Sequence, residues 1–248
     1  MSLLSHGISD IGCVRSQNQD RILLDDALGL YVVCDGVGGR RRGDLAAELA
    51  VQTIREFIES STDPTEVTWP YGYNPRGSFA GNRVLTAVKL ANRQVWRRAE
   101  DSLQLLGMGA TVAAVLVDGA TAAVANIGDS RAYLFRNQRL EQLSVDDTVS
   151  MQIAKSDGRA RAARSVLTRA AGSEQNVDVH VREVELVAGD LLLLCSDGLH
   201  AYLPEERIAA LIGTSQPMGD RLEALIGATR SVGAPDNISA LLLQFQNT

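Results

Sequence analysis

The chain has 248 residues, with 24 basic against 30 acidic side chains, so its formal charge is −6. Hydrophobic residues make up 45% and charged residues 22%, which is typical of a globular protein with a sizeable core and excludes disordered, collagen-like and fibrous classes. The acidic balance disfavours general nucleic-acid binding, which depends on a basic surface facing the phosphates. It leaves a local basic patch open.

The cysteine content and the N-terminus predict a cytoplasmic protein. The three cysteines, Cys13, Cys34 and Cys195, are too few for a disulfide framework and lack a C-x-x-C spacing. The first residues lack a basic segment followed by an apolar one, and no stretch approaches eighteen consecutive apolar residues. Secretion and membrane spanning are therefore disfavoured.

Short apolar runs bounded by Gly, Asp or Asn predict buried strands along most of the chain. These runs are residues 28–34, 111–117, 121–127, 131–136, 177–186, 190–195 and 238–245. Gly119 and the pair Asn137-Gln138 lie where tight turns would join neighbouring strands. We therefore expect antiparallel pairing rather than a doubly wound parallel sheet.

Apolar residues at helical spacing predict helices between these strands. One follows Gly43, with Asp44 as its N-cap, and three more are expected. These three span residues 79–101, 204–212 and 218–231. Residues 60–77 contain three prolines and predict an irregular loop. No composition break divides the chain, so we expect one α+β domain over residues 1–248.

The ends of the apolar runs carry aspartates. Three runs end in an aspartate and one begins just after an aspartate: Asp35, Asp129, Asp197 and Asp236. One Asp-Gly pair usually marks only a turn. Four carboxylates at the ends of buried strands would repel one another unless cations compensate them. Oxygen donors select Mg²⁺ or Mn²⁺ over zinc, and the three histidines lack ligand spacing.

The same segments offer no good nucleophile for covalent catalysis. Cys34 and Cys195 lie within strands and are interpreted as small buried hydrophobes. Residues 36–39 lack the Lys-Ser/Thr ending of a phosphate loop, and neither a G-x-S-x-G elbow nor a C-x-x-x-x-x-R loop occurs. Gly36 and Gly198 would let the backbone approach a metal closely, and the Gly36 carbonyl could itself be a ligand.

Seven motifs, in this order, resemble those of the bacterial type 2C, or PPM, metal-dependent serine/threonine protein phosphatases. They are SDIGCVRSQNQD (9–20), DGVGG (35–39), GMGAT (107–111), IGDSRAY (127–133), LTRAAG (167–172), GDLLLLCSDGL (189–199) and PDNI (235–238). The resemblance covers nearly the whole chain. It implies an antiparallel β-sandwich flanked by helices on both sides, an α-β-β-α arrangement.

The resemblance also implies the site residues. Asp35 would bridge two divalent ions, Mn²⁺ or Mg²⁺, and the Gly36 carbonyl would bind the second ion. The other implied roles are metal ligation by Asp197 and Asp236, a third and weaker ion at Asp129, an outer-shell role through water for Asp20, and substrate phosphate binding by Arg15.

The implied reaction is hydrolysis of phosphoserine and phosphothreonine in proteins by a water or hydroxide that bridges the two ions. Arg15 would offer a bidentate fork to the phosphate. We expect a monomeric signalling enzyme whose partners are phosphorylated proteins, with no nucleic-acid or membrane partner. The alternatives are a catalytically weak phosphoprotein-binding regulator and a metal-dependent phosphodiesterase or nuclease, the latter disfavoured by the acidic balance.

Two positions depart from the family pattern. Many relatives have Glu where this chain has Gln19, and a histidine soon after the Gly-Gly pair where it has Arg40. Residues 146–172 correspond to the flap beside the family's active site and look shortened. Their arginines Arg159, Arg161, Arg164 and Arg169, like Arg40, suggest either a solvated basic surface or a docking patch for phosphorylated or acidic segments.

Overall fold

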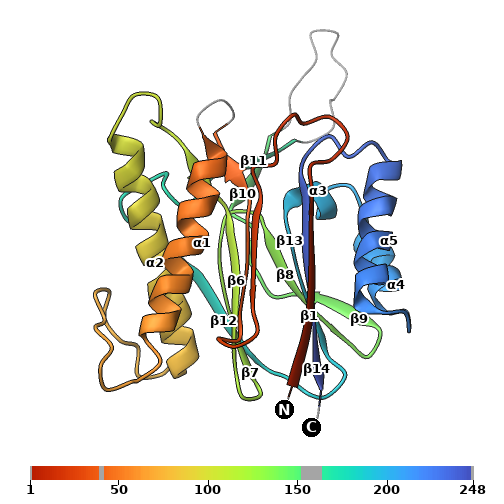
Figure 1. Cartoon of the computed structure of the whole chain (residues 1–248), viewed down its shortest axis with the longest axis horizontal. Coiled ribbons are helices and arrows are strands. Elements are labelled where there is room, and N and C mark those ends of the chain that lie inside the picture. Colours follow the sequence, from red (N-terminus) through yellow and green to blue (C-terminus); the bar gives the residue numbers. More distant parts are fainter. Residues whose placement is uncertain (1, 39–41, 152–163, 247–248) are drawn as a thin grey trace.

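The computed structural model describes residues 2–38, 42–151 and 164–246. Two five-stranded antiparallel sheets pack face to face, with helices on both outer faces (Figure 1). This confirms the expected α+β sandwich. Within the described residues, no helix is long and apolar enough to cross a bilayer.

One sheet has the strand order β12-β7-β6-β3-β2 and the other the order β1-β14-β13-β8-β9. The strands of the first sheet are β2 (Arg21–Asp25), β3 (Leu30–Cys34), β6 (Val112–Asp118), β7 (Thr121–Ile127) and β12 (His180–Glu185). Those of the second are β1 (Ser2–Asp10), β8 (Arg131–Arg136), β9 (Arg139–Gln142), β13 (Leu191–Cys195) and β14 (Ile238–Gln246).

The remaining elements cover the sheets or extend beyond them. Two short strand pairs join β4 (Gly36–Val37) to β5 (Gly109–Ala110) and β10 (Thr148–Met151) to β11 (Arg164–Leu167). The helices are α1 (Gly43–Ser60), α2 (Phe79–Glu100), α3 (Asp197–His200), α4 (Glu205–Ile212) and α5 (Met218–Ser231). Helices α1 and α2 cover the first sheet, and α3 to α5 cover the second (Figure 1).

Side-chain alternation along the strands builds three apolar layers. In β3, Leu30, Val32 and Cys34 pack in the layer under α1 and α2, whereas Tyr31 and Val33 pack between the sheets. The odd-numbered residues of β13, Cys195 included, face the C-terminal helices, and the even-numbered ones face the other sheet. Cys34 and Cys195 are thus fully buried and reduced, as expected.

The predicted elements differ from the structure at the start of α1 and in the strands that were not predicted. The N-cap of α1 is Arg42, in the left-handed region at φ 64° with no side-chain cap, so the assignment of Asp44 as N-cap is wrong. Asp44 lies in the first helical turn and pairs with Arg42 at 3.0 Å. The strands β1 and β2 were not predicted, because the apolar residues of β1 are interrupted by polar ones and the apolar run of β2 is only three residues long. The turn at Asn137-Gln138 is confirmed by the positive φ of both residues.

Antiparallel pairing places the aspartate-bearing ends together. Both β3 and β7 pair antiparallel with β6, so they run in the same direction and end at the same edge. In the second sheet, β13 ends where β14 begins, with Cys195 opposite Ala240. The chain termini lie at the other end of the sandwich (Figure 1).

Candidate metal centre

Asp35 is held by its main chain at the end of β3. Its N–H donates to Thr111 Oγ1 at 3.1 Å, and its carbonyl accepts from the Thr111 N–H at 2.8 Å. The Thr111 hydroxyl also lies 2.6 Å from that of Ser130. The two bonds between Asp35 and Thr111 use only the main-chain groups of Asp35, and not its carboxylate.

Gly36 allows a close approach between the β4 backbone and the start of α1. A Cβ built on Gly36 would lie 2.2 Å from the Gly43 carbonyl oxygen and 2.8 Å from that of Gln19. The Gly36 N–H donates to the Gln19 carbonyl at 3.2 Å. Only glycine fits at this position, so the sequence motif has a packing cause as well as the possible ligand role of its carbonyl.

Asp197 is the first residue of α3, directly after β13. Its Oδ1 is buried and has no hydrogen-bond partner among the described residues. Gly198 packs against the chain that follows Asp236, because a Cβ there would lie 1.8 Å from the Asn237 carbonyl oxygen. The two predicted ligands Asp197 and Asp236 are therefore held on neighbouring backbone segments.

Asp236 forms an ion pair with Arg15, whose Nη2 lies 2.7 Å from Oδ2. The pair is partly open to solvent, with 48% of the Arg15 side chain and 30% of the Asp236 side chain exposed. The structure therefore brings Arg15 directly to a predicted metal ligand, although these two residues are separated by more than two hundred positions.

Asn237 organises the loop that carries Arg15, a role that the sequence analysis missed. Its Oδ1 accepts from the Gln19 N–H at 2.9 Å, and its Nδ2 donates to the carbonyls of Ile11 at 2.9 Å and Gln17 at 3.0 Å. The side chain is buried. The PDNI motif contained this residue, but only the tertiary partners reveal what it does.

Asp20 is buried and lies against Ser196, the residue before Asp197. Its Oδ2 accepts from the Ser196 hydroxyl at 2.8 Å, whereas its Oδ1 has no hydrogen-bond partner among the described residues. Ser196 in turn accepts from the Ser239 N–H at 3.0 Å. Neither serine was singled out from the sequence, since serine is common in loops and only its burial marks it here.

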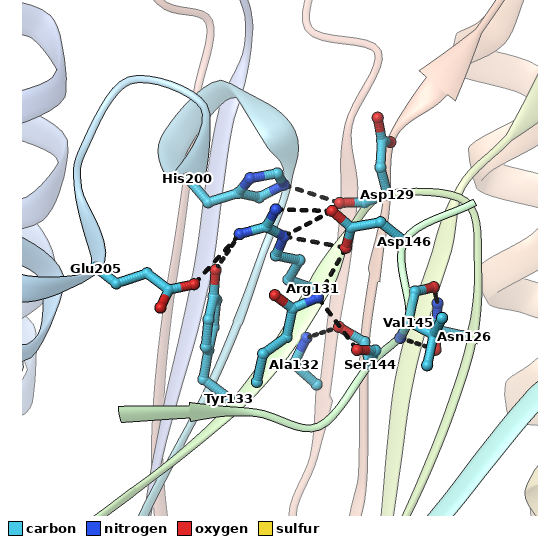
Figure 2. A network of polar contacts seen from close by, with 11 residues as sticks. Asn126, Asp129, Arg131, Ala132, Tyr133, Ser144, Val145, Asp146, His200 and Glu205 are labelled. Carbon is cyan, nitrogen blue, oxygen red and sulfur yellow. Dashed lines mark hydrogen bonds and ion pairs between the residues drawn. The ribbon is translucent and has the colours of Figure 1, made fainter. Parts of the chain in front are cut away.

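Asp129 follows β7, and its main-chain carbonyl accepts a hydrogen bond from His200 Nε2 at 2.8 Å. Figure 2 shows that its carboxylate points away from the polar network below it. That network centres on Arg131, which forks onto Asp146 and also reaches Tyr133. Burial lowers the pKa of His200 to about 4, and the charge of Arg131 adds to this effect, so the ring is neutral at pH 7.

The carboxylates influence one another electrostatically. Burial raises the pKa of Asp35 well above its ordinary value, and the charges of Asp20, Asp197 and Asp236 raise it further. Burial also raises the pKa of Asp20 and that of Asp129 to about 6, with the charge of Asp197 contributing to both. The pKa of Asp197 is raised by burial and by Asp236. The structure therefore gathers all five predicted aspartates into one region.

Within the described residues, the gathered carboxylates are not arranged as a complete set of metal ligands. Across residues 2–38, 42–151 and 164–246, no group of three His, Cys, Asp or Glu side chains is arranged as it stands to hold a metal ion. Asp236 is engaged by Arg15, and Asp20 by Ser196. The donor set is nonetheless oxygen-only and strongly anionic, with two buried carboxylate oxygens lacking partners, which suits a hard divalent cation.

Most of the arginines that were predicted to form a docking patch lie outside the described residues. Arg40, Arg159 and Arg161 lie outside the described residues, and only the backbone of Arg164 is described, in β11. Arg169 is not a free surface charge, because it pairs with the buried Asp147 at 2.8 Å. Its charge is compensated locally, and a docking role for Arg169 stays a prediction.

The comparisons with known proteins agree with the geometry. A family model described as protein phosphatase 2C matches residues 14–242. The chain is 30% identical over 249 residues to the serine/threonine phosphatase Stp of Listeria welshimeri, covering 95% of this chain and 93% of the relative. It is 29% identical to the serine/threonine protein phosphatase PstP of Mycobacterium tuberculosis, covering 94% of this chain and 43% of the relative.

Solved structures show the same fold. The crystal structure of the Mycobacterium tuberculosis phosphatase PstP/Ppp has a TM-score of 0.81 and 26% identity, covering all of both chains. The PstP catalytic domain in complex with two manganese ions has a TM-score of 0.79 and 25% identity, covering 99% of each chain. The sandwich and its acidic edge define a phosphatase of the PPM class. The chain belongs to the protein phosphatase 2C family.

Proposed function

We propose that this protein removes phosphate from phosphoserine and phosphothreonine in other proteins, using two divalent cations, Mn²⁺ or Mg²⁺. The observation that carries the proposal is the meeting of aspartates from separate segments beside Arg15 at one edge of the sandwich. Family membership supports the reaction, and the manganese complex of a relative supports the metal.

Asp35, Asp197, Asp236 and the Gly36 carbonyl are the groups that we assign to the two cations. Burial and the charges of its acidic neighbours raise the pKa of Asp35, and two divalent ions would offset this unfavourable negative charge. When bound, such ions supply an activated water near neutral pH and neutralise charge on the transferring phosphoryl group. Asp20 would orient water from its buried position behind Asp197, and Asp129 would hold a third, weaker ion.

Arg15 is assigned to the substrate phosphate. In the structure its guanidinium is held by Asp236. If Asp236 served as a cation ligand, this ion pair would be weakened, and Arg15 would be available to form a fork with two phosphate oxygens. The Asn237 hydrogen bonds keep the Arg15 loop beside the site throughout this exchange. Metal and phosphate binding are thus coupled through one ion pair.

Hydrolysis of p-nitrophenyl phosphate and of a phosphothreonine peptide tests the proposal. We expect phosphate release with Mn²⁺ or Mg²⁺ and none with EDTA. Metal-independent release, or no release with either metal, would contradict it. If neither metal supports release, binding of the phosphothreonine peptide without turnover would favour the alternative, a regulator that binds phosphoproteins. Retention of Asp35, Asp197, Asp236 and Arg15 disfavours that alternative.

The wider expectations stand as part of the same proposal. We propose that residues 1–248 form one catalytic domain, that the protein is a monomer and that it works in the cytoplasm. Arg40, Arg159, Arg161 and Arg164 remain candidates for docking of acidic or phosphorylated segments. Their substitution would raise KM for phosphoproteins without affecting p-nitrophenyl phosphate.

A further inference from the structure

The short helix α3 connects two of the aspartates through its last residue. Asp197 begins the helix and His200 ends it, one turn later. From there the His200 Nε2 donates to the Asp129 carbonyl at 2.8 Å. This bond crosses from the sheet that carries β13 to the end of β7 in the other sheet (Figure 2).

The turn around Asp129 has other supports, but none of them is attached to α3. Ser130 contacts Thr111 at 2.6 Å, and Arg131 forks onto Asp146 with bonds of 2.7 to 3.1 Å. Asp147 receives the Gly128 N–H at 2.9 Å. These bonds fold the turn. At its end the turn also joins the strand before α3, because Arg131 pairs with Cys195 in the β8–β13 ladder. The bond from His200 adds a contact from α3 itself to Asp129.

A restraint between these two segments has a physical purpose. The Asp129 and Asp197 carboxylates carry like charges in a poorly solvated region and repel each other. The His200 bond opposes this repulsion at Asp129 itself, beyond the restraint that the β8–β13 pairing gives the neighbouring residues. A cation shared near both needs them at a set separation, and an ordered ligand loses less entropy on binding.

We propose that His200 is a positioning residue that holds Asp129 relative to Asp197 and thereby sets the affinity for the third, weaker cation. The inference rests on the proposed function, because that proposal assigns the third cation to Asp129. His200 itself touches neither substrate nor cation.

Manganese titration of the full chain tests the inference, with electron paramagnetic resonance reporting unbound Mn²⁺. In His200→Leu we expect the weakest binding step to lose about three- to tenfold in affinity, as for loss of one hydrogen bond, with the tighter steps unchanged. His200→Gln, whose amide N–H reaches a similar point, should restore most of it. His6→Leu, which removes an imidazole from β1, should bind as wild type.

Each outcome bears on a different proposal. If Asp129→Asn keeps the weak step, the third site is not at Asp129, and that part of the proposed function fails. If Asp129→Asn removes the weak step but His200→Leu binds as wild type, the positioning role alone is overturned. Equal weakening of every step in His200→Leu also overturns it, since His200 would then support only the fold. Should His200→Leu unfold, His200→Asn, whose amide is too short, replaces it and must show the same selective loss.

Discussion

At the scale of single residues, the site combines carboxylates that are poorly solvated with one arginine that compensates them in part. Asp20 and Asp197 each keep a buried oxygen with no partner within the described residues, and Asp236 relies on Arg15. Such groups disfavour the folded state of the metal-free protein and favour cation binding. Stability and function are therefore opposed at these positions.

Asp35→Asn should separate the effect of this carboxylate on stability from its effect on activity. We expect turnover to fall by at least about a hundredfold, since the carboxylate that we assign to the two cations is lost. The metal-free protein should melt about 2–4 °C higher, the shift that about 1 kcal/mol produces in a chain of this size, because an unfavourable charge is removed. Activity assays and thermal melts in EDTA measure both, and near-normal activity would show that the metals are wrongly placed.

Arg15→Ala should chiefly raise KM for a phosphothreonine peptide, by about tenfold or more, with a smaller change in kcat. Arg15→Lys should recover little of this loss, because an ammonium group cannot form the planar fork. Steady-state kinetics with saturating Mn²⁺ give the comparison. An unchanged KM in both variants would remove the role assigned to Arg15.

At the scale of elements, the junction between α3 and the start of β14 determines where two ligands lie. Gly198 contacts the Asn237 backbone, and the Asn237 side chain holds the N-terminal loop. The sequence interval between these residues is long, yet their packing leaves no space for a methyl group. A small change in one element is therefore transmitted to Asp197, Asp236 and Arg15 together.

Gly198→Ala should abolish tight metal binding and lower the melting temperature, because its Cβ would lie 1.8 Å from the Asn237 carbonyl oxygen unless the two segments separate. Gly227→Ala is the matched control, since a Cβ at that position in α5 meets no atom within 4 Å. The control should be neutral or stabilised by up to about 1 kcal/mol. Thermal melts and Mn²⁺ titrations of both variants test this prediction. Equal losses of melting temperature and of Mn²⁺ affinity in the two variants would refute the packing argument.

At the scale of the whole molecule, the charge of −6 is unevenly placed, with five aspartates converging at one edge. The pKa of Asp20 and that of Asp129 are raised from 3.8 to about 6 in the folded protein. Between these pH values the folded state binds more protons than the unfolded state. The contribution of these groups to metal-free stability is thus present at low pH and is lost as the pH rises through about 6.

This linkage predicts a pH-dependent effect of Asp129→Asn in EDTA. The difference builds up between the unfolded-state pKa of 3.8 and the folded-state pKa of about 6. The variant should therefore melt at nearly the wild-type temperature at pH 4 and clearly higher than wild type at pH 7.5. The wild-type affinity for Mn²⁺ should also fall as the pH drops below about 6, because protons compete with the cation. A difference in melting temperature that is the same at both pH values would contradict the pKa shift.

Much of this architecture could be predicted from local patterns. Continuous apolar runs such as 238–245 and the helical spacing within 79–101 identified buried elements, because burial on both faces or along one stripe dictates composition. The strands β1 and β2 were not predicted, since the apolar residues of β1 are interrupted by polar ones and the run in β2 is too short to be distinctive. The start of α1 was misplaced because aspartate is a favoured N-cap residue, whereas Asp44 lies in the first helical turn and pairs with Arg42.

The sequence alone determined the chemical character of the site, because carboxylates at the ends of buried strands need compensation wherever those ends lie. It could not determine which groups meet. The bond from His200 to Asp129, the Asn237 anchor and the Arg15–Asp236 pair join residues that are far apart in the chain. Such contacts are made only when two sheets pack and their edges align, so the tertiary structure alone decided how the aspartates are held.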